Sequence, residues 1–266
     1  MVAALEHKDN WAVVLGGSSG LGLATAKKLA KHGYHICIVH RNRKSDLGAV
    51  EEQFLSVKSL GVKLMHFNVD ACLAEKRNSI IETLKETIGK EASIRVLVHS
   101  LAKGNLKPMV ATDEKPVLKS DDFLLTINAM AISLYDWTKA IFDAGLFAKD
   151  SRIISFTSEG NSKAWQNYAA VSAAKTSLEA ISRNIALEFA PYGIRCNCIQ
   201  AGVTDTNSLR MIPGSDQIIK HSIRRNPFGR LTTPEDVANV VYLLSKDEAA
   251  WITGSIIPVD GGEHIS

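Results

Sequence analysis

Short β-branched runs alternate regularly with longer amphipathic segments along almost the whole chain. The short runs lie at 11–15, 35–39, 62–67, 95–99, 152–156, 193–199 and 255–259, and helical patterns lie near 20–32, 46–60, 74–89, 121–146, 167–190 and 234–245. Short apolar strands separated by helices are typical of βαβ units, whose parallel sheet is buried on both faces. The alternation therefore predicts an α/β fold, with one doubly wound parallel sheet and helices on both faces.

The composition fits one domain of this kind. The chain has 266 residues, of which 45% are hydrophobic and 22% charged, and this balance can bury a large core. Because no repeat or flexible linker divides it, residues 1–266 are expected to form a single domain. The net charge of +3 gives no reason to expect a nucleic-acid or membrane surface. The first residues carry mixed charges, unlike a signal peptide, so a cytoplasmic location is expected.

The cysteines and histidines do not predict a metal site. Cys37, Cys72, Cys196 and Cys198 lack the paired spacing of zinc ligands, and the last two fall in a strand pattern where alternate residues face opposite ways. None of the eight histidines belongs to a His-Glu-x-x-His motif. Reduced, mostly buried thiols and no metal are expected.

Two stretches interrupt the alternation. Residues 101–120 form a polar connection after the fourth expected strand, and residues 205–230 lie between the sixth strand and the next helix. Long connections at the carboxyl ends of parallel strands are where open α/β sheets usually hold ligands. The second stretch has a helical apolar pattern of its own, made by Leu209, Ile212, Ile218, Ile219 and Ile223. It is expected to cover the substrate, whereas a surface loop is an alternative interpretation of the first.

A glycine turn after the first expected strand predicts a dinucleotide site in a Rossmann-type sheet. Its glycines follow the spacing Gly-x-x-x-Gly-x-Gly and lead directly into a helix. Glycines let the backbone approach a pyrophosphate, whose charge is met by the helix N-terminus. The residues expected to bind the cofactor here are Gly16, Ser18, Ser19, Gly20, Leu21 and Gly22.

The end of the second expected strand favours NADPH over NADH. An Asp or Glu at this point would bind the adenosine ribose and repel a 2′-phosphate. This chain instead has Arg41, Asn42, Arg43 and Lys44, with no carboxylate among them. Since an arginine can hold a phosphate through two parallel hydrogen bonds, Arg41 and Asn42 are expected to bind NADPH. A solvated basic turn is the alternative interpretation.

The glycine spacing resembles that of the short-chain dehydrogenase/reductase superfamily, and later features extend the resemblance over nearly the whole chain. They are Asn128, Lys175 and the Val-Asp-Gly-Gly sequence at 259–262, whereas Leu15 replaces the usual threonine. The resemblance implies that Val69 and Asp70 lie against the adenine and that the chain after the fourth strand passes beside the cofactor. The further cofactor contacts that it implies are Ser100, Leu101, Ala102, Lys175, Gly202, Thr204 and Thr206.

The position of the tyrosine separates this chain from ordinary members, which have a tyrosine four residues before the catalytic lysine. Here that position is Val171, which cannot donate a proton, and the available tyrosine is Tyr168, seven residues before Lys175. In one continuous helix, Tyr168 and Lys175 would lie about two turns, or roughly 10 Å, apart along the axis. Tyr168 can take the ordinary tyrosine's place only if the helix begins after it.

The Tyr-x6-Lys spacing resembles the enoyl-acyl-carrier-protein reductases, most closely their NADPH-dependent FabL-like branch. The His-Ser-Leu-Ala sequence at 99–102, Ala201-Gly202 and the stretch from Asp205 to Arg230 add to the likeness. The resemblance implies NADPH-dependent reduction of the trans-2 double bond of an enoyl-acyl-carrier protein or enoyl-CoA in fatty-acid synthesis. It gives Tyr168 the developing enolate oxygen and Lys175 the nicotinamide ribose.

Two other functions stay open. Asn128 and Ser158 resemble the carbonyl-reducing set of ordinary members, which makes a reductase of 3-oxoacyl thioesters or another ketone one alternative. A non-catalytic NADP-binding regulatory protein is the other, although Tyr168 and Lys175 are both present. Ser158 is a candidate for substrate contact, since it lies thirteen residues before Val171, and a hydroxyl at a strand end is its other interpretation.

The two long helical segments also predict self-association. Segments 121–146 and 167–190 carry apolar residues on more than one face, and such a helix needs a second partner to bury them. Family resemblance suggests that this partner is another subunit, giving a homodimer or a homotetramer.

Overall fold

A parallel β-sheet forms the centre of the computed structural model, which describes residues 10–89, 93–110, 114 and 116–266. In these residues seven strands pair in the order β3-β2-β1-β4-β5-β6-β7, and each pairing is parallel. The strands are β1 (Asn10–Leu15), β2 (His35–His40), β3 (Leu64–Asn68), β4 (Ser93–His99), β5 (Phe147–Thr157), β6 (Ile194–Ala201) and β7 (Ile256–Val259). The strand order reverses between β1 and β4, and open sheets of this kind bind ligands at such a point.

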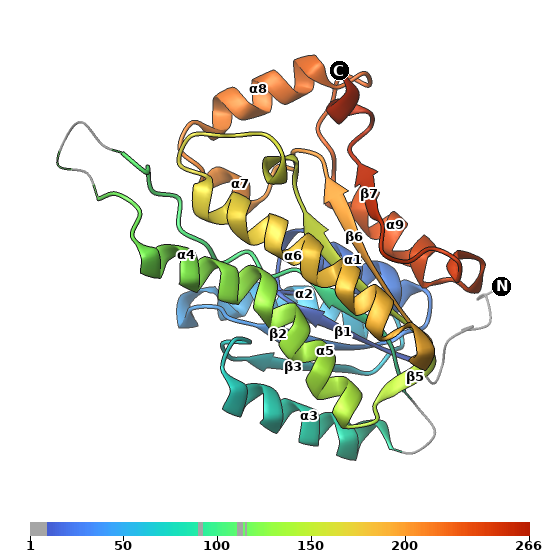
Figure 1. The fold of residues 1–266 in the computed structure, drawn as a ribbon. Coiled ribbons are helices and arrows are strands. Elements are labelled where there is room, and N and C mark those ends of the chain that lie inside the picture. Colours follow the sequence, from blue (N-terminus) through green and yellow to red (C-terminus); the bar gives the residue numbers. More distant parts are fainter. Residues whose placement is uncertain (1–9, 90–92, 111–113, 115) are drawn as a thin grey trace.

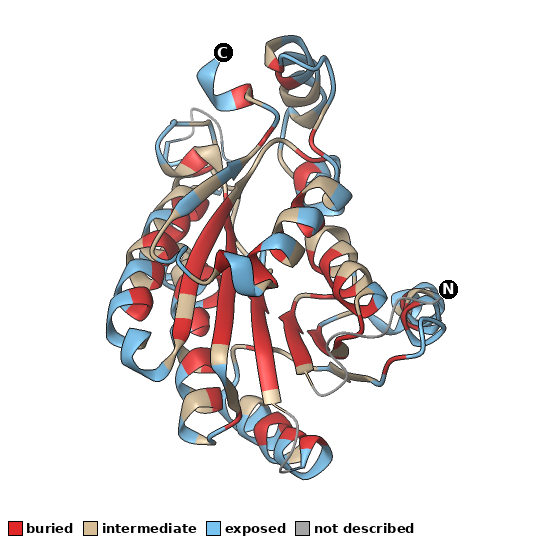
Figure 2. Cartoon of the chain, turned by 90° about the vertical axis from the view of Figure 1, so that its right-hand side faces the viewer, coloured by how far each residue is buried: buried red, intermediate tan, exposed pale blue. Residues whose placement is uncertain are grey.

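Helices cover both faces of the sheet (Figure 1). One face carries α1 (Gly20–Lys31), α2 (Leu47–Lys58) and α9 (Pro234–Ser245), and the other carries α3 (Ala74–Ile88), α4 (Ser120–Ile127), α5 (Ser133–Asp143) and α6 (Ala169–Glu188). Val13 and Leu15 of β1 pack with α3, α5 and α6, whereas Ala12 and Val14 pack with α1, α2 and α9. Since successive strand residues point to opposite faces, the apolar runs are buried on both sides, as the red strands of Figure 2 show.

The predicted fold class is confirmed, and all seven predicted strands are present. The largest difference in a strand is the start of β5, at Phe147 instead of the predicted residue 152. Phe147 pairs with Ile94 ahead of an irregularity in the register, and Arg152 then pairs with Val96. The early part of this strand is more polar than the buried run, so its hydrophobic pattern does not mark it.

Two predicted helices differ from the structure in informative ways. The helix predicted at 121–146 is interrupted between α4 and α5 by a π-helical turn, Asn128–Ile132. A π turn changes the hydrogen bonding without ending the apolar pattern, which is why the pattern predicts a single helix. The helix predicted at 167–190 begins at Ala169, because Asn167 has a left-handed backbone (φ 62°) that an α-helix cannot contain.

Residues 205–230, predicted to cover the substrate, form two short helices, α7 (Asn207–Arg210) and α8 (Ser215–Arg225). This confirms their helical pattern, and both helices lie beyond the carboxyl end of β6 (Figure 1). A bridge between Thr204 and Thr232 closes the base of the segment, with the Thr232 amide donating to the Val203 carbonyl oxygen (3.2 Å). The segment is therefore tied at both ends to the sheet edge from which it departs.

The cysteines are free thiols, as predicted. Cys37, Cys196 and Cys198 are buried and Cys72 is partly buried. Within the described parts of the chain, no three or more His, Cys, Asp or Glu side chains come together in a way that could hold a metal ion. Within the same parts, no helix has the length and apolar character needed to cross a bilayer.

Candidate active site

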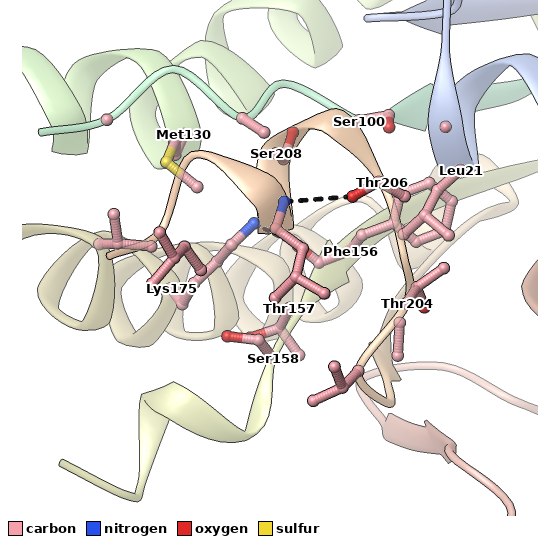
Figure 3. A pocket seen from close by; sticks show the side chains of 18 of the residues that line it. Leu21, Ser100, Met130, Phe156, Thr157, Ser158, Lys175, Thr204, Thr206 and Ser208 are labelled. Carbon is pink, nitrogen blue, oxygen red and sulfur yellow. Dashed lines mark hydrogen bonds between the residues drawn. The ribbon is translucent and has the colours of Figure 1, made fainter. Parts of the chain in front are cut away.

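A cavity of about 450 Å³ opens at the carboxyl ends of the central strands and collects most of the predicted site residues. Those that line it are Gly16, Ser18, Ser19, Gly20, Leu21, Arg41, Ser100, Leu101, Ala102, Ser158, Tyr168, Lys175, Gly202, Thr204 and Thr206. Figure 3 shows Lys175, Met130 and Ser158 in one part of it and Leu21, Ser100 and Thr204 in another. The predictions from the glycine turn, the strand ends and the long helix thus converge on one space.

Four predicted cofactor residues lie outside this wall, as far as the structure describes it. They are Gly22, Asn42, Val69 and Asp70. Gly22 lies behind the turn, where a Cβ atom would come within 2.2 Å of the Gly16 carbonyl oxygen. The Val69 amide donates to the His40 carbonyl oxygen (2.8 Å), and the Asn42 amide donates to the Asn68 side chain (2.8 Å). Gly22 therefore supports the cavity wall from behind, and Asn42 and Val69 tie together the chain that follows β2 and β3.

The glycine turn fits a dinucleotide pyrophosphate. Gly16 has a positive φ (83°), and a Cβ atom on it would lie 2.4 Å from the Ser100 carbonyl oxygen, so no other residue fits without a shift. Helix α1 begins directly after this turn, with no acidic side chain in its first turn and no side-chain cap from Ser19. The first backbone N–H groups of α1 are thus available to an anion, and the helix dipole favours negative charge there.

The chain that follows β2, β3 and β4 forms an ion cluster at one end of the cavity. Arg41 Nη1 donates to Asp70 Oδ2 (2.8 Å), and Lys103 Nζ donates to the same oxygen (3.1 Å). Burial alone would raise the pKa of Asp70, but hydrogen bonds from the Cys72 amide and from Lys103 outweigh it and hold the pKa below its ordinary value. Arg41 and Lys103 line the cavity. The sequence does not predict Lys103 as a site residue, because it lies in a polar connection without a motif.

Lys175 occupies the opposite, buried part of the cavity. Its Nζ donates to the Phe156 carbonyl oxygen (2.6 Å) at the end of β5. Burial lowers the pKa of Lys175 from 10.5 to about 8, against smaller opposing effects of Cys198 and Glu179. A backbone hydrogen bond therefore holds the ammonium in the wall. Because its pKa is about 8, the group loses its proton in mildly alkaline solution.

Tyr168 lies just outside the helix that carries Lys175. Helix α6 begins at Ala169, so the condition that the helix begin after Tyr168 is met, and Tyr168 caps the helix, with its carbonyl oxygen accepting from the Ser172 amide (2.8 Å). The Tyr168 hydroxyl lies 3.3 Å from Ser158 Oγ, and burial raises the pKa of Tyr168 while this hydrogen bond lowers it. Ser158, the first residue after β5, thus contacts the tyrosine.

The tyrosine ring is closely packed. A Cβ atom on Gly160 would lie 2.4 Å from its Cε1 atom, and the Trp165 ring is 5.3 Å away between centroids. Val171, at the ordinary tyrosine position, is also buried and lines the cavity with Met130. The position from which ordinary members donate a proton is therefore an apolar part of the wall.

Asn128 does not join this group. It begins the π-helical turn, its side chain is exposed, and it is absent from the described residues that line the cavity. Met130, two residues later, faces the cavity instead (Figure 3). Asn128 resembles the carbonyl-reducing set in sequence, but the structure does not place it in the site.

A second ion cluster, which the sequence does not predict, ties the covering segment down. Arg225 Nη2 at the end of α8 donates to Glu159 (2.6 Å) and to Glu263 (2.9 Å), and Glu263 also accepts from the Val203 amide (3.2 Å). Arg225, Glu159 and Glu263 line the cavity. They come from three distant parts of the sequence and belong to no motif, so spacing alone could not reveal them.

Comparison with known proteins gives a consistent family. The family model described as Enoyl-(Acyl carrier protein) reductase matches residues 16–264. An uncharacterised oxidoreductase of Bacillus subtilis (strain 168) is 28% identical over 97% of this chain and 98% of its own length. A 7α-hydroxysteroid dehydrogenase of Paraclostridium sordellii is 29% identical over 98% of this chain and 93% of its own. The first is named only as an oxidoreductase and the second as a steroid dehydrogenase, so these two names do not give this chain a substrate.

Two solved structures are similar over their whole length. The enoyl-acyl carrier protein reductase of Bacillus cereus, solved with NADP+ and indole naphthyridinone, is 26% identical with a TM-score of 0.85, over 98% of both chains. The enoyl-[acyl-carrier-protein] reductase (NADH) of Aquifex aeolicus VF5 is 25% identical with a TM-score of 0.83, over 99% of both chains. The first was solved with NADP+ and the second is named for NADH, so the likeness alone does not choose between NADH and NADPH.

Proposed function

Because the chain belongs to the enoyl-(acyl carrier protein) reductase family of the short-chain dehydrogenase/reductase superfamily, we propose that it reduces the trans-2 double bond of an enoyl thioester with NADPH. The thioester would be carried by acyl carrier protein or coenzyme A. The observation that carries the proposal is the pairing of an apolar Val171 in the cavity wall with a hydroxyl from Tyr168, which precedes the helix. This arrangement removes the ordinary proton donor and supplies a different one to the same space.

The cofactor would lie along the carboxyl ends of the central strands. The glycine turn and the N-terminus of α1 would hold the pyrophosphate, and Arg41 would favour the 2′-phosphate. The remaining contacts would come from Ser100, Leu101, Ala102, Gly202, Thr204 and Thr206, which line the same cavity. When bound, the nicotinamide supplies a hydride to the β-carbon of the substrate, and a proton from solvent at the α-carbon completes the reduction.

Tyr168 and Lys175 would divide the catalytic work. Because burial raises the pKa of Tyr168, its hydroxyl stays a neutral donor at physiological pH and would meet the charge that develops on the thioester oxygen. Such a preorganised donor contributes about 10²–10³ in rate. Lys175 would hold the nicotinamide ribose, and its ammonium would add a positive potential that water screens poorly in a buried site.

A second candidate function has one observation in its favour. The 3.3 Å contact between the Ser158 and Tyr168 hydroxyls is the kind of serine–tyrosine pair that could bind and protonate a ketone. Reduction of 3-oxoacyl thioesters or another ketone is therefore the alternative, while the exposed position of Asn128 speaks against it.

A substrate comparison tests the proposal. The rate of NADPH consumption by the wild-type protein is measured with crotonyl-CoA and with acetoacetyl-CoA at equal concentrations. We expect crotonyl-CoA to be reduced at least about tenfold faster, a difference of roughly 1.4 kcal/mol in transition-state stabilisation. Preference for acetoacetyl-CoA would support the carbonyl reductase instead. NADPH binding without turnover of either thioester would support the non-catalytic NADP-binding protein.

We also propose that the protein is a homo-oligomer. Helices α4, the π turn, α5 and α6 expose large apolar side chains, namely Leu124, Leu125, Ile132, Tyr135 and Leu187. Ile132 and Tyr135 line a shallow groove with Ile181 and Phe189 between these helices. Light scattering at micromolar concentration should give a dimer or tetramer, and the Ile132→Asp variant should shift it towards monomer. A monomeric wild type would contradict the proposal.

A further inference from the structure

Arg41, Asp70 and Lys103 form a three-membered group, here called the Asp70 cluster, whose composition exceeds what one phosphate-binding arginine needs. Each residue follows a different strand, β2, β3 or β4, so the sheet brings them together from three separate connections. Both cations donate to the same carboxylate oxygen, Asp70 Oδ2, at 2.8 and 3.1 Å. The guanidinium and the ammonium therefore lie side by side at the cavity, and the cluster carries a net positive charge.

The two cations are free to exchange their partner, whereas the carboxylate is fixed. Arg41 and Lys103 side chains are 61% and 46% exposed, and Asp70 is 21% exposed. Asp70 Oδ1 accepts from the Cys72 amide (3.0 Å), which anchors the carboxylate to the backbone. Exposed ion pairs contribute only about 0–1 kcal/mol, so releasing either cation from Asp70 costs little.

A phosphate monoester matches this cluster better than Asp70 alone does. It carries nearly two negative charges and three acceptor oxygens, whereas Asp70 offers both cations one shared oxygen. Charge-assisted hydrogen bonds to phosphate are roughly twice as strong as neutral ones, and arginine and lysine serve as forked and point-like donors. A ligand phosphate entering here could accept from both cations at once.

We propose that Lys103 is a second determinant of cofactor specificity, which binds the 2′-phosphate of NADPH together with Arg41. The Asp70 carboxylate holds the two cations together when no phosphate is bound. This inference rests on the proposed use of NADPH, to which it adds a residue from the connection after β4. It concerns only the choice of dinucleotide, so it does not depend on whether an enoyl or a carbonyl group is reduced.

The test compares two ligands that differ by one phosphate. Isothermal titration calorimetry of the protein without added cofactor is carried out with 2′,5′-ADP and with 5′-AMP at about 0.05 M salt, where charge interactions are weakly screened. The wild type should bind 2′,5′-ADP at least about tenfold more tightly than 5′-AMP. The Lys103→Gln variant should lose about five- to tenfold of this ratio through weaker 2′,5′-ADP binding, with 5′-AMP binding unchanged within about twofold.

Two control variants make the result specific. Lys107 lies in the same connection and pairs with Asp122 (2.8 Å) but does not line the described wall, so Lys107→Gln makes the same charge change and should leave both affinities unchanged. Lys103→Arg, which keeps a cation, should retain the preference for 2′,5′-ADP.

The outcomes separate the inference from the proposed function. A wild type that binds both ligands equally would overturn the NADPH preference and the inference with it. A wild type that discriminates while Lys103→Gln discriminates equally well would overturn only the role of Lys103. Equal weakening of both ligands by Lys103→Gln would also overturn it, because the effect would not depend on the 2′-phosphate.

Discussion

The two ends of the cavity hold their cations in opposite ways. At the end formed by the Asp70 cluster, Arg41 and Lys103 are exposed and share a carboxylate. At the other end Lys175 is buried and donates to a backbone carbonyl. Water screens the charges of Arg41 and Lys103 much more than the charge of Lys175. The interaction energies at the two ends therefore depend on different conditions. The exposed end depends on ionic strength and on the number of charges in the ligand, whereas the buried end depends on the protonation of one group.

The largest effect should appear at the buried end, on removal of one hydroxyl. Tyr168→Phe should lower kcat with crotonyl-CoA by about 10²–10³, because the donor would act on charge that develops in the transition state. NADPH affinity should stay within about twofold. Steady-state kinetics and fluorescence titration with NADPH measure the two quantities.

Tyr34→Phe is a matched control for this variant. Tyr34 is also buried, and its hydroxyl donates to Ser245 at the same 3.3 Å, in a part of the core that does not line the described cavity. Its kcat should match that of the wild type. If the Tyr168→Phe variant reduces crotonyl-CoA as fast as the wild type, the proposed catalytic role of the buried end is wrong.

The glycine turn between the two ends should show the next largest effect. Gly16→Ala places a methyl group 2.4 Å from the Ser100 carbonyl oxygen at a positive φ, which should lower the free energy of unfolding by roughly 1–3 kcal/mol. NADPH affinity should fall as well. Gly48→Ala in α2, where a Cβ atom meets nothing within 4 Å, should instead be neutral or stabilise by about 0.5–1 kcal/mol. Urea unfolding measures both, and equal effects of the two variants would contradict the close packing of this turn.

The pH dependence should distinguish the buried ammonium next. Burial lowers the pKa of Lys175 to about 8, so kcat/KM should fall about tenfold per pH unit above that value as the ammonium loses its proton. The Lys175→Arg variant, which keeps its charge over this range, should be less active but lack this decline. A pH profile that is flat from 7 to about 9.5 in the wild type would show that the charge of Lys175 is not needed.

Stability should move in the opposite direction to activity. Between about 8 and the ordinary value of 10.5, the unfolded chain binds more protons at Lys175 than the folded chain does. Unfolding free energy therefore rises with pH in this window through Lys175, and the burial cost is fully present below it. The rise should be smaller in Lys175→Met, and urea unfolding at several pH values gives the difference between the two proteins.

The smallest effect concerns salt. Raising ionic strength from about 0.05 to 0.5 M should weaken NADPH binding several-fold, because the exposed cations of the Asp70 cluster are screened. NADH binding should change less, since NADH lacks the 2′-phosphate. The fold loss in kcat caused by Tyr168→Phe should be the same at both ionic strengths. Equal salt dependence for NADH and NADPH would show that the exposed end does not distinguish them.

What the sequence predicts well is whatever depends on local pattern. The strands of the sheet are apolar runs bounded by helices, and the glycine turn has a fixed spacing, so the turn lies where expected and every strand overlaps its predicted run, although β5 begins earlier. Lys175 and Tyr168 could be predicted as site residues because a helix and a known spacing connect them, and both line the cavity. Asn167 has a left-handed backbone, so the helix begins only after Tyr168. No sequence pattern marks this conformation, because asparagine adopts it only in some contexts.

The residues that sequence analysis misses depend on tertiary contact. Lys103 meets Asp70 across 33 residues, and Arg225 meets Glu159 and Glu263 across 66 and 38 residues. Each contact exists because parallel strands place their carboxyl ends along one edge, where separate connections converge. The sequence around a single lysine or arginine does not show which acidic side chain it will pair with there.

The π-helical turn Asn128–Ile132 gives the fold an evolutionary freedom at its cavity wall. One residue more or fewer in a helix rotates everything on one side of that point by about 100°. Because α5 is fixed to the sheet through Leu134, Trp137 and Ile141, the rotation falls on α4 and on the residues that reach the cavity, such as Met130. Gain or loss of a single residue here would therefore change which side chains of α4 and of the turn face the cavity.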